Sequence, residues 1–126
     1  LNFLRDAGVY YLATADGDQP HVRPIGFVMD WNGKPAFCTG NKKDMCRQLA
    51  ANPKVEICAY HDSKAIRICG KAVFVTSPES QAKALEVMPA LGKIYSVGDG
   101  IFEIFCLEDV KACFSDMLGN KQEIEL

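Results

Sequence analysis

The sequence predicts a mainly β domain with a few short helices, in which antiparallel strands form a barrel. Turn signals such as DGD at residues 16–18 and GDG at 98–100 divide the chain at short intervals. The segments between them are rich in Val, Ile, Phe, Tyr and Thr, which favour strands. Helical segments do not alternate with strands and the pattern GxGxxG is absent, so a Rossmann fold is not expected. Closely spaced, meandering strands favour a barrel over a sandwich.

The first part of the chain is expected to contain a short helix and a meander of strands. Residues 2–7 are typical of the end of a helix. The dipeptide Asn32-Gly33 is a hairpin signal, because both residue types adopt positive φ angles readily. The strands expected here span residues 8–15, 21–30 and 34–39.

A central helix is expected over residues 42–51, where the apolar period changes from strand to helix. Met45 and Leu49 form a stripe at helical spacing, with Asn41 as the expected N-cap. Asn52-Pro53 ends this helix.

The second part of the chain returns to strands around one more helix. Ser77 followed by Pro78 reads as an N-cap and a first helical position, which opens a helix to about residue 87. The strands expected here span residues 55–61, 65–76, 101–107 and 111–115.

Size and charge restrict the class of protein. The chain has 126 residues, 48% of them hydrophobic, which predicts one globular domain over residues 1–126. Its 14 basic and 16 acidic residues give a net charge of -2, so we expect no nucleic-acid partner. No apolar run approaches the roughly 20 residues that span a bilayer. Arg5 and Asp6 interrupt the N-terminal apolar stretch, unlike a signal peptide, so a cytoplasmic protein without membrane contact is expected.

The six cysteines are expected to be reduced thiols, most of them buried as small hydrophobes. None belongs to a CxxC pair or has a histidine at zinc-finger spacing, so no metal site is expected. Cys46 stands apart, because neighbouring Lys42 and Lys43 at a helix start can lower the pKa of a thiol. We favour an inert thiol there as well. The cysteines are Cys38, Cys46, Cys58, Cys69, Cys106 and Cys113.

Basic residues at the start of the central helix are the main functional signal. Lys42 and Lys43 fall in its expected first turn, where the helix already carries partial positive charge and unpaired N–H groups. A bound phosphate would turn this unfavourable arrangement into a binding site. Arg23, on a neighbouring strand, is expected to reach the same place and offer a bidentate fork. The residues alone leave two alternatives of equal weight: a phosphate site, or a solvated basic turn partly compensated by Asp44.

The order of several short motifs resembles a known family. R-P-x-G at residues 23–26 precedes F-x-T at 37–39, the basic helix start, and Q-L-x-x-N-P at 48–53. I-R-I-C-G-K-A at 66–72 and F-E-I-F at 102–105 extend the similarity over nearly the whole chain. Together they resemble a short, single-domain branch of the FMN-binding split barrels related to pyridoxamine 5'-phosphate oxidase. The resemblance implies a six-stranded antiparallel split barrel, working as a homodimer with FMN in two equivalent grooves at the interface.

The resemblance assigns residues to the phosphate end of FMN. Arg23 matches the arginine that holds the phosphate. Lys43 matches a phosphate contact at the helix start, which Lys42 is expected to share. Thr39 matches the strand-end hydroxyl near the phosphate and the ribityl chain, and Asn41 is a further candidate in the turn.

The resemblance also assigns residues to the ring end of FMN. Pro24 and Ile25 match the strand stretch along the edge of the isoalloxazine. Tyr95 and Ser96 are candidates for the mouth of the groove. Residues 43–45 read Lys-Asp-Met where larger oxidases of the family carry Ser-Arg-Lys.

The function implied is that of an FMN-dependent oxidoreductase with an unidentified small-molecule electron donor or acceptor. Hydride transfer at the flavin needs no acidic or basic side chain, so catalytic residues are not assigned. One alternative is a non-catalytic FMN carrier or redox sensor. Another, ranked lower, keeps the fold but binds haem or a deazaflavin.

Overall fold

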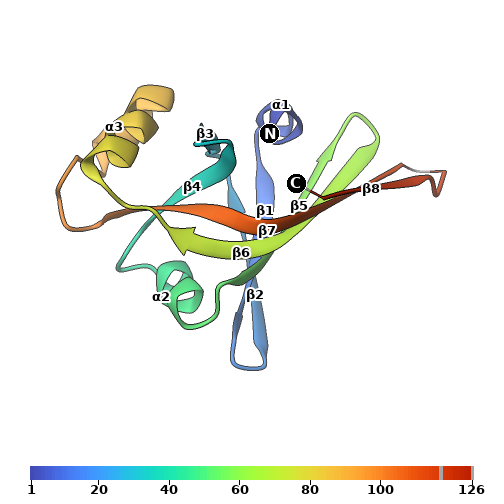
Figure 1. Ribbon diagram of the computed structural model, residues 1–126, viewed down its shortest axis with the longest axis horizontal. Helices are drawn as coiled ribbons and strands as arrows, with labels where there is room; N and C mark the ends of the chain where they lie inside the picture. Colours follow the sequence, from blue (N-terminus) through green and yellow to red (C-terminus); the bar gives the residue numbers. More distant parts are fainter. Residues whose placement is uncertain (117, 126) are drawn as a thin grey trace.

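In the described part of the chain, residues 1–116 and 118–125 of a computed structural model, eight antiparallel strands form one sheet (Figure 1). The sheet coils into a split barrel, which confirms the mainly β fold predicted from the sequence. Its order is β2-β1-β5-β6-β7-β4-β3, with β8 paired to β7. The strands are Tyr10–Asp16 (β1), Gln19–Ile25 (β2), Met29–Trp31 (β3), Lys34–Gly40 (β4), Lys54–His61 (β5), Lys64–Phe74 (β6), Phe102–Asp116 (β7) and Lys121–Glu125 (β8).

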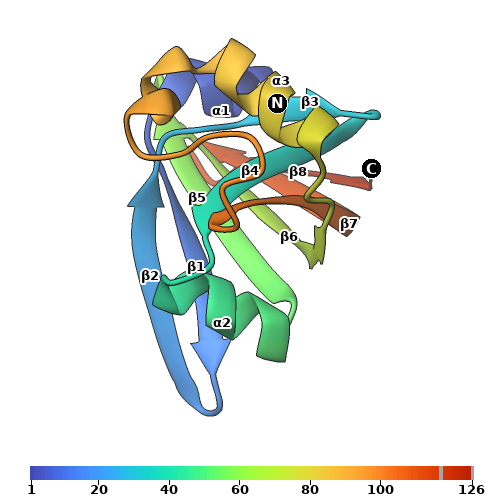
Figure 2. The same cartoon turned by 90° about the vertical axis from the view of Figure 1, so that its left-hand side faces the viewer.

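Short helices lie around the sheet. Figures 1 and 2 place two of them toward one end of the barrel and the central helix toward the other. No helix in the described ranges is both long and apolar enough to cross a membrane. The helical segments are Asn2–Ala7 (α1), Asp44–Ala51 (α2), Pro78–Val87 (α3) and the 3-10 turn Pro89–Lys93 (η1), with α2 the central helix.

Strand alternation builds the interior of the barrel. On β1, Tyr10, Leu12 and Thr14 are buried, whereas Tyr11 is exposed and Ala13 half-buried. This period of two places one face of the strand inward. The buried face packs against neighbouring strands and against the apolar side of α2.

Strands β4 and β7 are buried on both faces. Phe37 and Phe105 pack inside the barrel with ring centroids 5.5 Å apart. Their neighbours Ala36 and Ile104 point the other way and join a second cluster with Ala84 of α3. This explains the mostly apolar first part of β7, residues 102–107, since a strand covered on both faces loses the polar alternation.

The strand expected over residues 21–30 is two strands, which is a correction to the sequence prediction. β2 ends at Ile25, and residues 26–28 leave the ladder before β3 begins. The buried hydroxyl of Tyr10 donates to the Phe27 carbonyl, and Phe27 itself is buried. A long-range bond therefore breaks a strand that looks continuous in the sequence.

The two strands expected over residues 101–107 and 111–115 are one long strand, β7. A positive φ of 54° at Asp109 and a register shift between Cys69 and Lys71 of β6 mark a bulge. The bulge accommodates the polar residues at this point without a turn. The sequence predicted seven strands and did not predict the hairpin strand β8. The division of residues 21–30 and the addition of β8 add two strands, and the fusion within β7 removes one, which gives the eight strands of the described residues.

The helix predictions succeed where their signals are local. α1 spans the expected residues, and α3 begins after Ser77, whose hydroxyl accepts from the Ser80 N–H at 3.0 Å. The Asn32-Gly33 turn has the expected positive φ angles of 52° and 83°.

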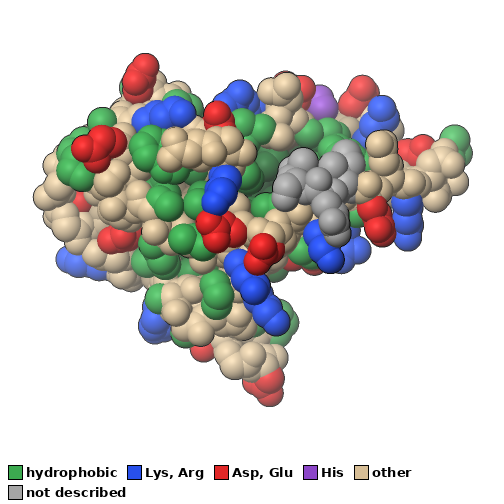
Figure 3. Space-filling view, in the orientation of Figure 1, with side chains coloured by type: hydrophobic (Ala, Val, Ile, Leu, Met, Phe, Trp, Pro, Cys, Tyr) green, Lys and Arg blue, Asp and Glu red, His purple; other side chains and the backbone are tan. Residues whose placement is uncertain are grey.

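Over the face in Figure 3, acidic and basic side chains are intermixed.

The expectation that most cysteines are buried is wrong. Only Cys46 and Cys106 are buried among the six, while Cys58 and Cys69 are exposed. All are free thiols. The apolar runs that contain Cys58 and Cys69 are strands with an outward face, and these residues occupy it.

Candidate functional site

A groove of about 280 Å³ opens where the barrel is split. One side is the end of β2 and the residues that follow it, and the other is the outer half of β4. β4 pairs with β3 only over residues 34–36, so residues 37–40 have no strand neighbour on that edge within the described chain. Figure 2 shows the segment after α3 passing in front of β4, with α2 below it.

The groove is apolar along most of its length and has a single charged lining residue in the described chain, Lys43. Its β2 side is formed by Pro24 and Ile25, which the sequence assigned to the cofactor. The remaining lining residues are Gly26, Phe27, Phe37, Cys38, Met88, Leu91, Ile94 and Tyr95. Such a surface suits a flat, largely apolar ligand that has a negative group near Lys43.

The outer wall of the groove is fastened to β7. Tyr95 stacks on Phe102 with ring centroids 4.6 Å apart and planes 12° apart. Gln81 of α3 donates to the Phe102 carbonyl at 2.8 Å and accepts from the Gly98 N–H at 3.0 Å. The Asp99 carboxylate accepts backbone N–H bonds on both sides of this contact. These bonds hold a long connection in one conformation beside the groove.

Arg23 of β2 directs its guanidinium toward α2. Nη1 donates to Thr14 Oγ1 at 2.8 Å and to the Leu12 carbonyl at 3.4 Å, and Nη2 donates to Gln48 Oε1 at 2.9 Å. All three acceptors are uncharged, and no residue in the described ranges forms an ion pair with Arg23. Burial lowers the pKa of Arg23, while the Asp44 carboxylate raises it. The side chain remains a cation at neutral pH, because arginine does not lose its proton in proteins.

Lys42 and Lys43 precede α2, which corrects the expected helix start. The helix begins at Asp44, and Lys43 is an extended N-cap without a side-chain capping bond. Neither lysine has an ion-pair partner among residues 1–116 and 118–125, and Asp44 pairs with Arg47 at 3.2 Å. The start of α2 therefore keeps free N–H groups and positive charge, which favour an anion. Lys43 lines the groove, whereas Lys42 is exposed outside it.

Asn41 is not the cap of α2. Its side chain donates to the Gly100 carbonyl at 2.6 Å, and its N–H donates to the Ile101 carbonyl at 2.9 Å. Asn41 thus ties the approach to α2 to the wall of the groove. A bond to residues some 60 positions away outcompetes the local cap that the sequence suggests.

Thr39 is 2% exposed and does not line the groove. Its Oγ1 has no hydrogen-bond partner among the described residues. An unpartnered buried hydroxyl costs about 1–3 kcal/mol, so a small movement or a ligand atom that satisfied it would stabilise the site. The contact of Thr39 with a cofactor stays a prediction.

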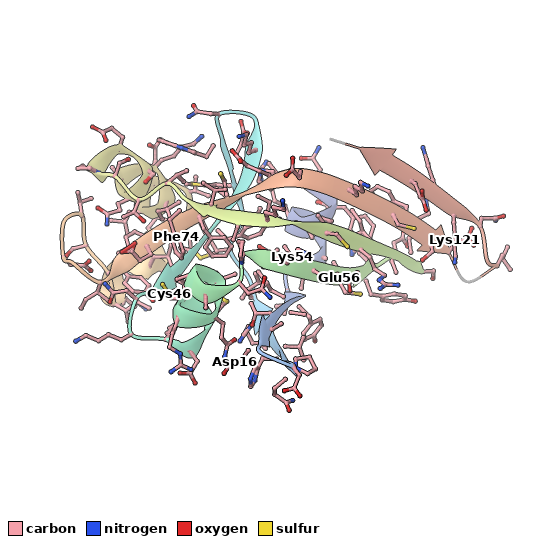
Figure 4. All side chains as sticks on the ribbon, turned by 60° about the horizontal axis from the view of Figure 1, so that its bottom comes forward. Asp16, Cys46, Lys54, Glu56, Phe74 and Lys121 are labelled. Atoms are coloured by element: carbon pink, nitrogen blue, oxygen red, sulfur yellow. The ribbon has the colours of Figure 1, made fainter. Side chains whose placement is uncertain are left out.

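Burial keeps the thiols near the site protonated. It raises the pKa of Cys38 to about 11, although Lys43 lowers it. Burial also raises the pKa of Cys46, with a further contribution from Glu103. Cys46 lies on α2 (Figure 4), and the basic residues before it do not produce a reactive thiolate, in line with the inert thiol we favoured. The described residues contain no group of three His, Cys, Asp or Glu that could hold a metal ion.

The structure joins some of the predicted site residues and separates others. Pro24, Ile25 and Lys43 share the groove with Tyr95, and Arg23 docks on the helix that Lys43 precedes. The sequence suggested Tyr95 for the mouth of the groove, but it did not identify Phe102 as the stacking partner of Tyr95.

Sequence reasoning missed three contributors to the site. Cys38 lies between two motif residues, and only the open edge of β4 exposes it to the groove. Thr14 and Gln48 meet Arg23 from different elements, and they are 34 residues apart in the chain. Gln48 belongs to the quoted Q-L-x-x-N-P motif, which was the available signal.

The chain is similar to solved structures of one fold. A NimC/NimA family protein from Clostridium acetobutylicum has a TM-score of 0.93 and 36% identity, over 98% of this chain and 90% of that chain. A pyridoxamine 5'-phosphate oxidase-related, FMN binding protein from Nostoc punctiforme has a TM-score of 0.67 and 15% identity, over 100% and 92%. A heme binding protein from Mycobacterium smegmatis has a TM-score of 0.74 and 18% identity, and the chain spans 57% of its length.

The two structures of lower identity support the fold alone. A comparison with curated protein sequences gives no match. The sequence model of the family described as pyridoxamine 5'-phosphate oxidase matches residues 1–100. That match covers most of the chain, and the protein belongs to the pyridoxamine 5'-phosphate oxidase family.

Proposed function

We propose that this protein binds FMN in the groove at the split of the barrel and acts as an FMN-dependent oxidoreductase. Proteins of this family commonly bind FMN. The observation that carries the proposal is the make-up of one site: an apolar groove whose lining includes Lys43, at the start of a helix on which Arg23 is docked outside the groove. The planar ring of FMN matches the apolar groove, and its dianionic phosphate matches the two cations.

The apolar part of the groove fits the isoalloxazine ring. Pro24 and Ile25 offer a strand edge on one side, and Met88 and Tyr95 offer side chains on the other. The open edge of β4 leaves backbone polar groups beside the groove, which are suitable partners for the polar edge of a ring.

The polar part fits a phosphate. Lys43 and Arg23 form no ion pair with a carboxylate in the described ranges, although Asp44 acts on Arg23 at longer range. The first N–H groups of α2 lack a side-chain cap. Charge-assisted bonds to phosphate oxygens are about twice as strong as neutral ones. We expect these groups to hold the phosphate, with the Thr39 hydroxyl as a further donor.

FMN, when bound, supplies electron or hydride transfer, and the protein positions it. The apolar wall keeps water from one face of the site, and the stacked Tyr95 keeps that wall in place. The Cys38 thiol faces the groove and stays protonated at neutral pH, since its pKa is about 11. The partner in electron transfer is a small molecule that reaches the exposed side of the ring.

We further propose that two copies assemble and complete the groove. Tyr11, Val22 and Tyr60 lie on the outward face of neighbouring strands and are 51%, 68% and 61% exposed. Apolar side chains grouped in this way favour burial against another protein surface. Sedimentation velocity tests the dimer: a monomer at micromolar concentration contradicts it.

The chromophore of the purified protein tests the proposed function. We expect flavin absorption, one FMN per chain, reduction by a nicotinamide cofactor or another donor, and reoxidation by an acceptor. Bound FMN that resists every donor would support a carrier or redox sensor instead. A Soret band or a deazaflavin band without FMN would contradict the proposal.

A further inference from the structure

The guanidinium of Arg23 is held in place by uncharged partners. Thr14 and Gln48 are each 4% exposed, and each accepts one bond from a different terminal nitrogen of Arg23. Their own oxygens are joined by a bond of 2.5 Å from Thr14 Oγ1 to Gln48 Oε1. The three side chains therefore form a closed network between β1, β2 and α2, in which Thr14 and Gln48 are buried and Arg23 is half-buried.

The chemistry of these groups permits one arrangement of protons. Arginine only donates, and the amide oxygen of Gln48 only accepts. The Thr14 hydroxyl accepts from Arg23, so its own proton is directed to Gln48. The network fixes the amide of Gln48 with its oxygen toward Arg23, so each of the three hydrogen bonds has only one possible donor.

This arrangement uses one end of the guanidinium and leaves one side of it without a hydrogen-bond partner among the described residues. The acceptors of Nη1 and Nη2 are Thr14 Oγ1 and Gln48 Oε1, which lie 2.5 Å apart. The two bonds therefore use the end of the guanidinium where Nη1 and Nη2 lie side by side. The other fork, made by Nε–H and the second N–H of Nη2, has no acceptor within residues 1–116 and 118–125. A fork of this geometry matches two oxygens of a phosphate or carboxylate.

Gln48 occupies the place where a carboxylate would cancel the charge of Arg23. A glutamate has nearly the same shape and would form a stronger bond to a guanidinium. A buried glutamine orients the same group and leaves its positive charge for a ligand. We propose that Gln48, assisted by Thr14, is a positioning residue that aims the free fork of Arg23 at the ligand phosphate without neutralising it.

This inference rests on the proposed FMN site, and its test separates the two. Affinities for FMN and riboflavin are measured by fluorescence quenching for the full chain and for the Gln48→Glu, Gln48→Met and Thr14→Val variants. The ratio of the two affinities isolates the phosphate, because the ring is common to both ligands.

The wild type is expected to prefer FMN. Gln48→Glu is expected to lower that preference by about tenfold or more, because Arg23 would then pair with a carboxylate instead of an uncharged amide. Its riboflavin affinity is expected to stay within about twofold. Its melting temperature is expected to stay close to that of the wild type, because the attraction to Arg23 offsets the cost of burying the new carboxylate. Gln48→Met and Thr14→Val are expected to give smaller losses of preference.

A purely structural role predicts a different pattern, in which ligand preference follows stability. A stable Gln48→Glu variant that keeps the full FMN preference would overturn the role of Gln48 and leave the FMN site intact. Equal wild-type affinity for FMN and riboflavin would overturn both proposals.

Discussion

Tyr95 lies flat on Phe102, with ring centroids 4.6 Å apart and an angle of 12° between the planes. Tyr95 belongs to the long connection after α3, and Phe102 is the first residue of β7. Because Tyr95 also lines the groove, this single stack joins the wall of the candidate site to the edge of the barrel.

Replacing Tyr95 is expected to loosen that wall. Tyr95→Leu removes the stack and part of the buried area, at an expected cost of about 1–3 kcal/mol in the free energy of unfolding. FMN affinity is expected to fall as well, because the wall loses its fixed position. Urea denaturation and flavin titration measure the two effects. Tyr95→Phe is the matched control, since it keeps the stack, and a control as damaged as Tyr95→Leu would contradict the role of stacking.

Gly40 is expected to be required beneath Tyr95. A Cβ at this position would lie 2.9 Å from the Tyr95 hydroxyl oxygen and 3.3 Å from the ring. The ring cannot move away easily because it is stacked on Phe102. Gly40→Ala is therefore expected to destabilise the protein by about 1–3 kcal/mol.

Removing the obstructing oxygen tests the cause of that loss. In a Tyr95→Phe background, the nearest contact is the ring carbon at 3.3 Å, so Gly40→Ala is expected to cost less. A double-mutant cycle by urea denaturation measures the difference. Strict additivity of the two changes would show that Tyr95 is not the obstacle.

Acid is expected to release the connection that carries Tyr95. The Asp99 carboxylate has a pKa below its ordinary value, chiefly because the Phe102 N–H donates to it, followed by the N–H groups of Ile101 and Ser96. A lowered pKa in the folded state contributes stability above the unfolded-state pKa of about 3.9. That contribution is lost as the pH falls through the lower, folded-state pKa.

The Asp99→Asn variant isolates this contribution. Its melting temperature is expected to lie below that of the wild type at neutral pH, and the gap is expected to shrink as the pH falls below about 4. Differential scanning calorimetry across this range measures the gap. A gap that stays constant with pH would contradict the account of Asp99.

Cys38 is expected to report on the groove through its slow alkylation. With a pKa of about 11 in place of an ordinary 9.0, its thiolate is roughly 100-fold scarcer near pH 7 than that of an unperturbed cysteine. Iodoacetamide is expected to modify the exposed Cys58 first, as measured by mass spectrometry of each peptide. Saturating FMN is expected to protect Cys38 further without affecting Cys58. Equal labelling of Cys38 with and without FMN would place the flavin elsewhere.

Local signals predict α3 and the hairpin turn because their partners are adjacent in the chain. Ser77 caps α3 through Ser80, three residues away, and Asn32-Gly33 needs only its own backbone angles. The barrel topology was predicted as a resemblance, which the match to residues 1–100 supports.

Long-range bonds decide the features that sequence reasoning missed. Asn41 looks like a cap, but its side chain binds the Gly100 carbonyl. Residues 21–30 look like one strand, but Tyr10 draws the Phe27 carbonyl out of the ladder. Gln48 looks like one polar residue of an amphipathic helix, and only the fold brings Arg23 to it. In each case the deciding partner lies too far along the chain for local pattern to identify.

The central claim is that Lys43 and Arg23 hold the phosphate of FMN. Lys42, which the sequence also assigned to the phosphate, provides the matched comparison: it has the same charge as its neighbour Lys43 but lies outside the groove, so we no longer expect it to contact the ligand. A charge-assisted bond contributes about 1.5–3 kcal/mol, which corresponds to roughly 10- to 150-fold in affinity.

The most direct measurement compares FMN and riboflavin affinities of the wild type with those of Lys43→Ala, Arg23→Ala and Lys42→Ala. We expect the wild type to prefer FMN, and we expect Lys43→Ala and Arg23→Ala to lose about tenfold or more of that preference. Riboflavin affinity is expected to change little, and Lys42→Ala is expected to behave nearly as the wild type. Equal losses for both ligands in Lys43→Ala and Arg23→Ala would contradict the account.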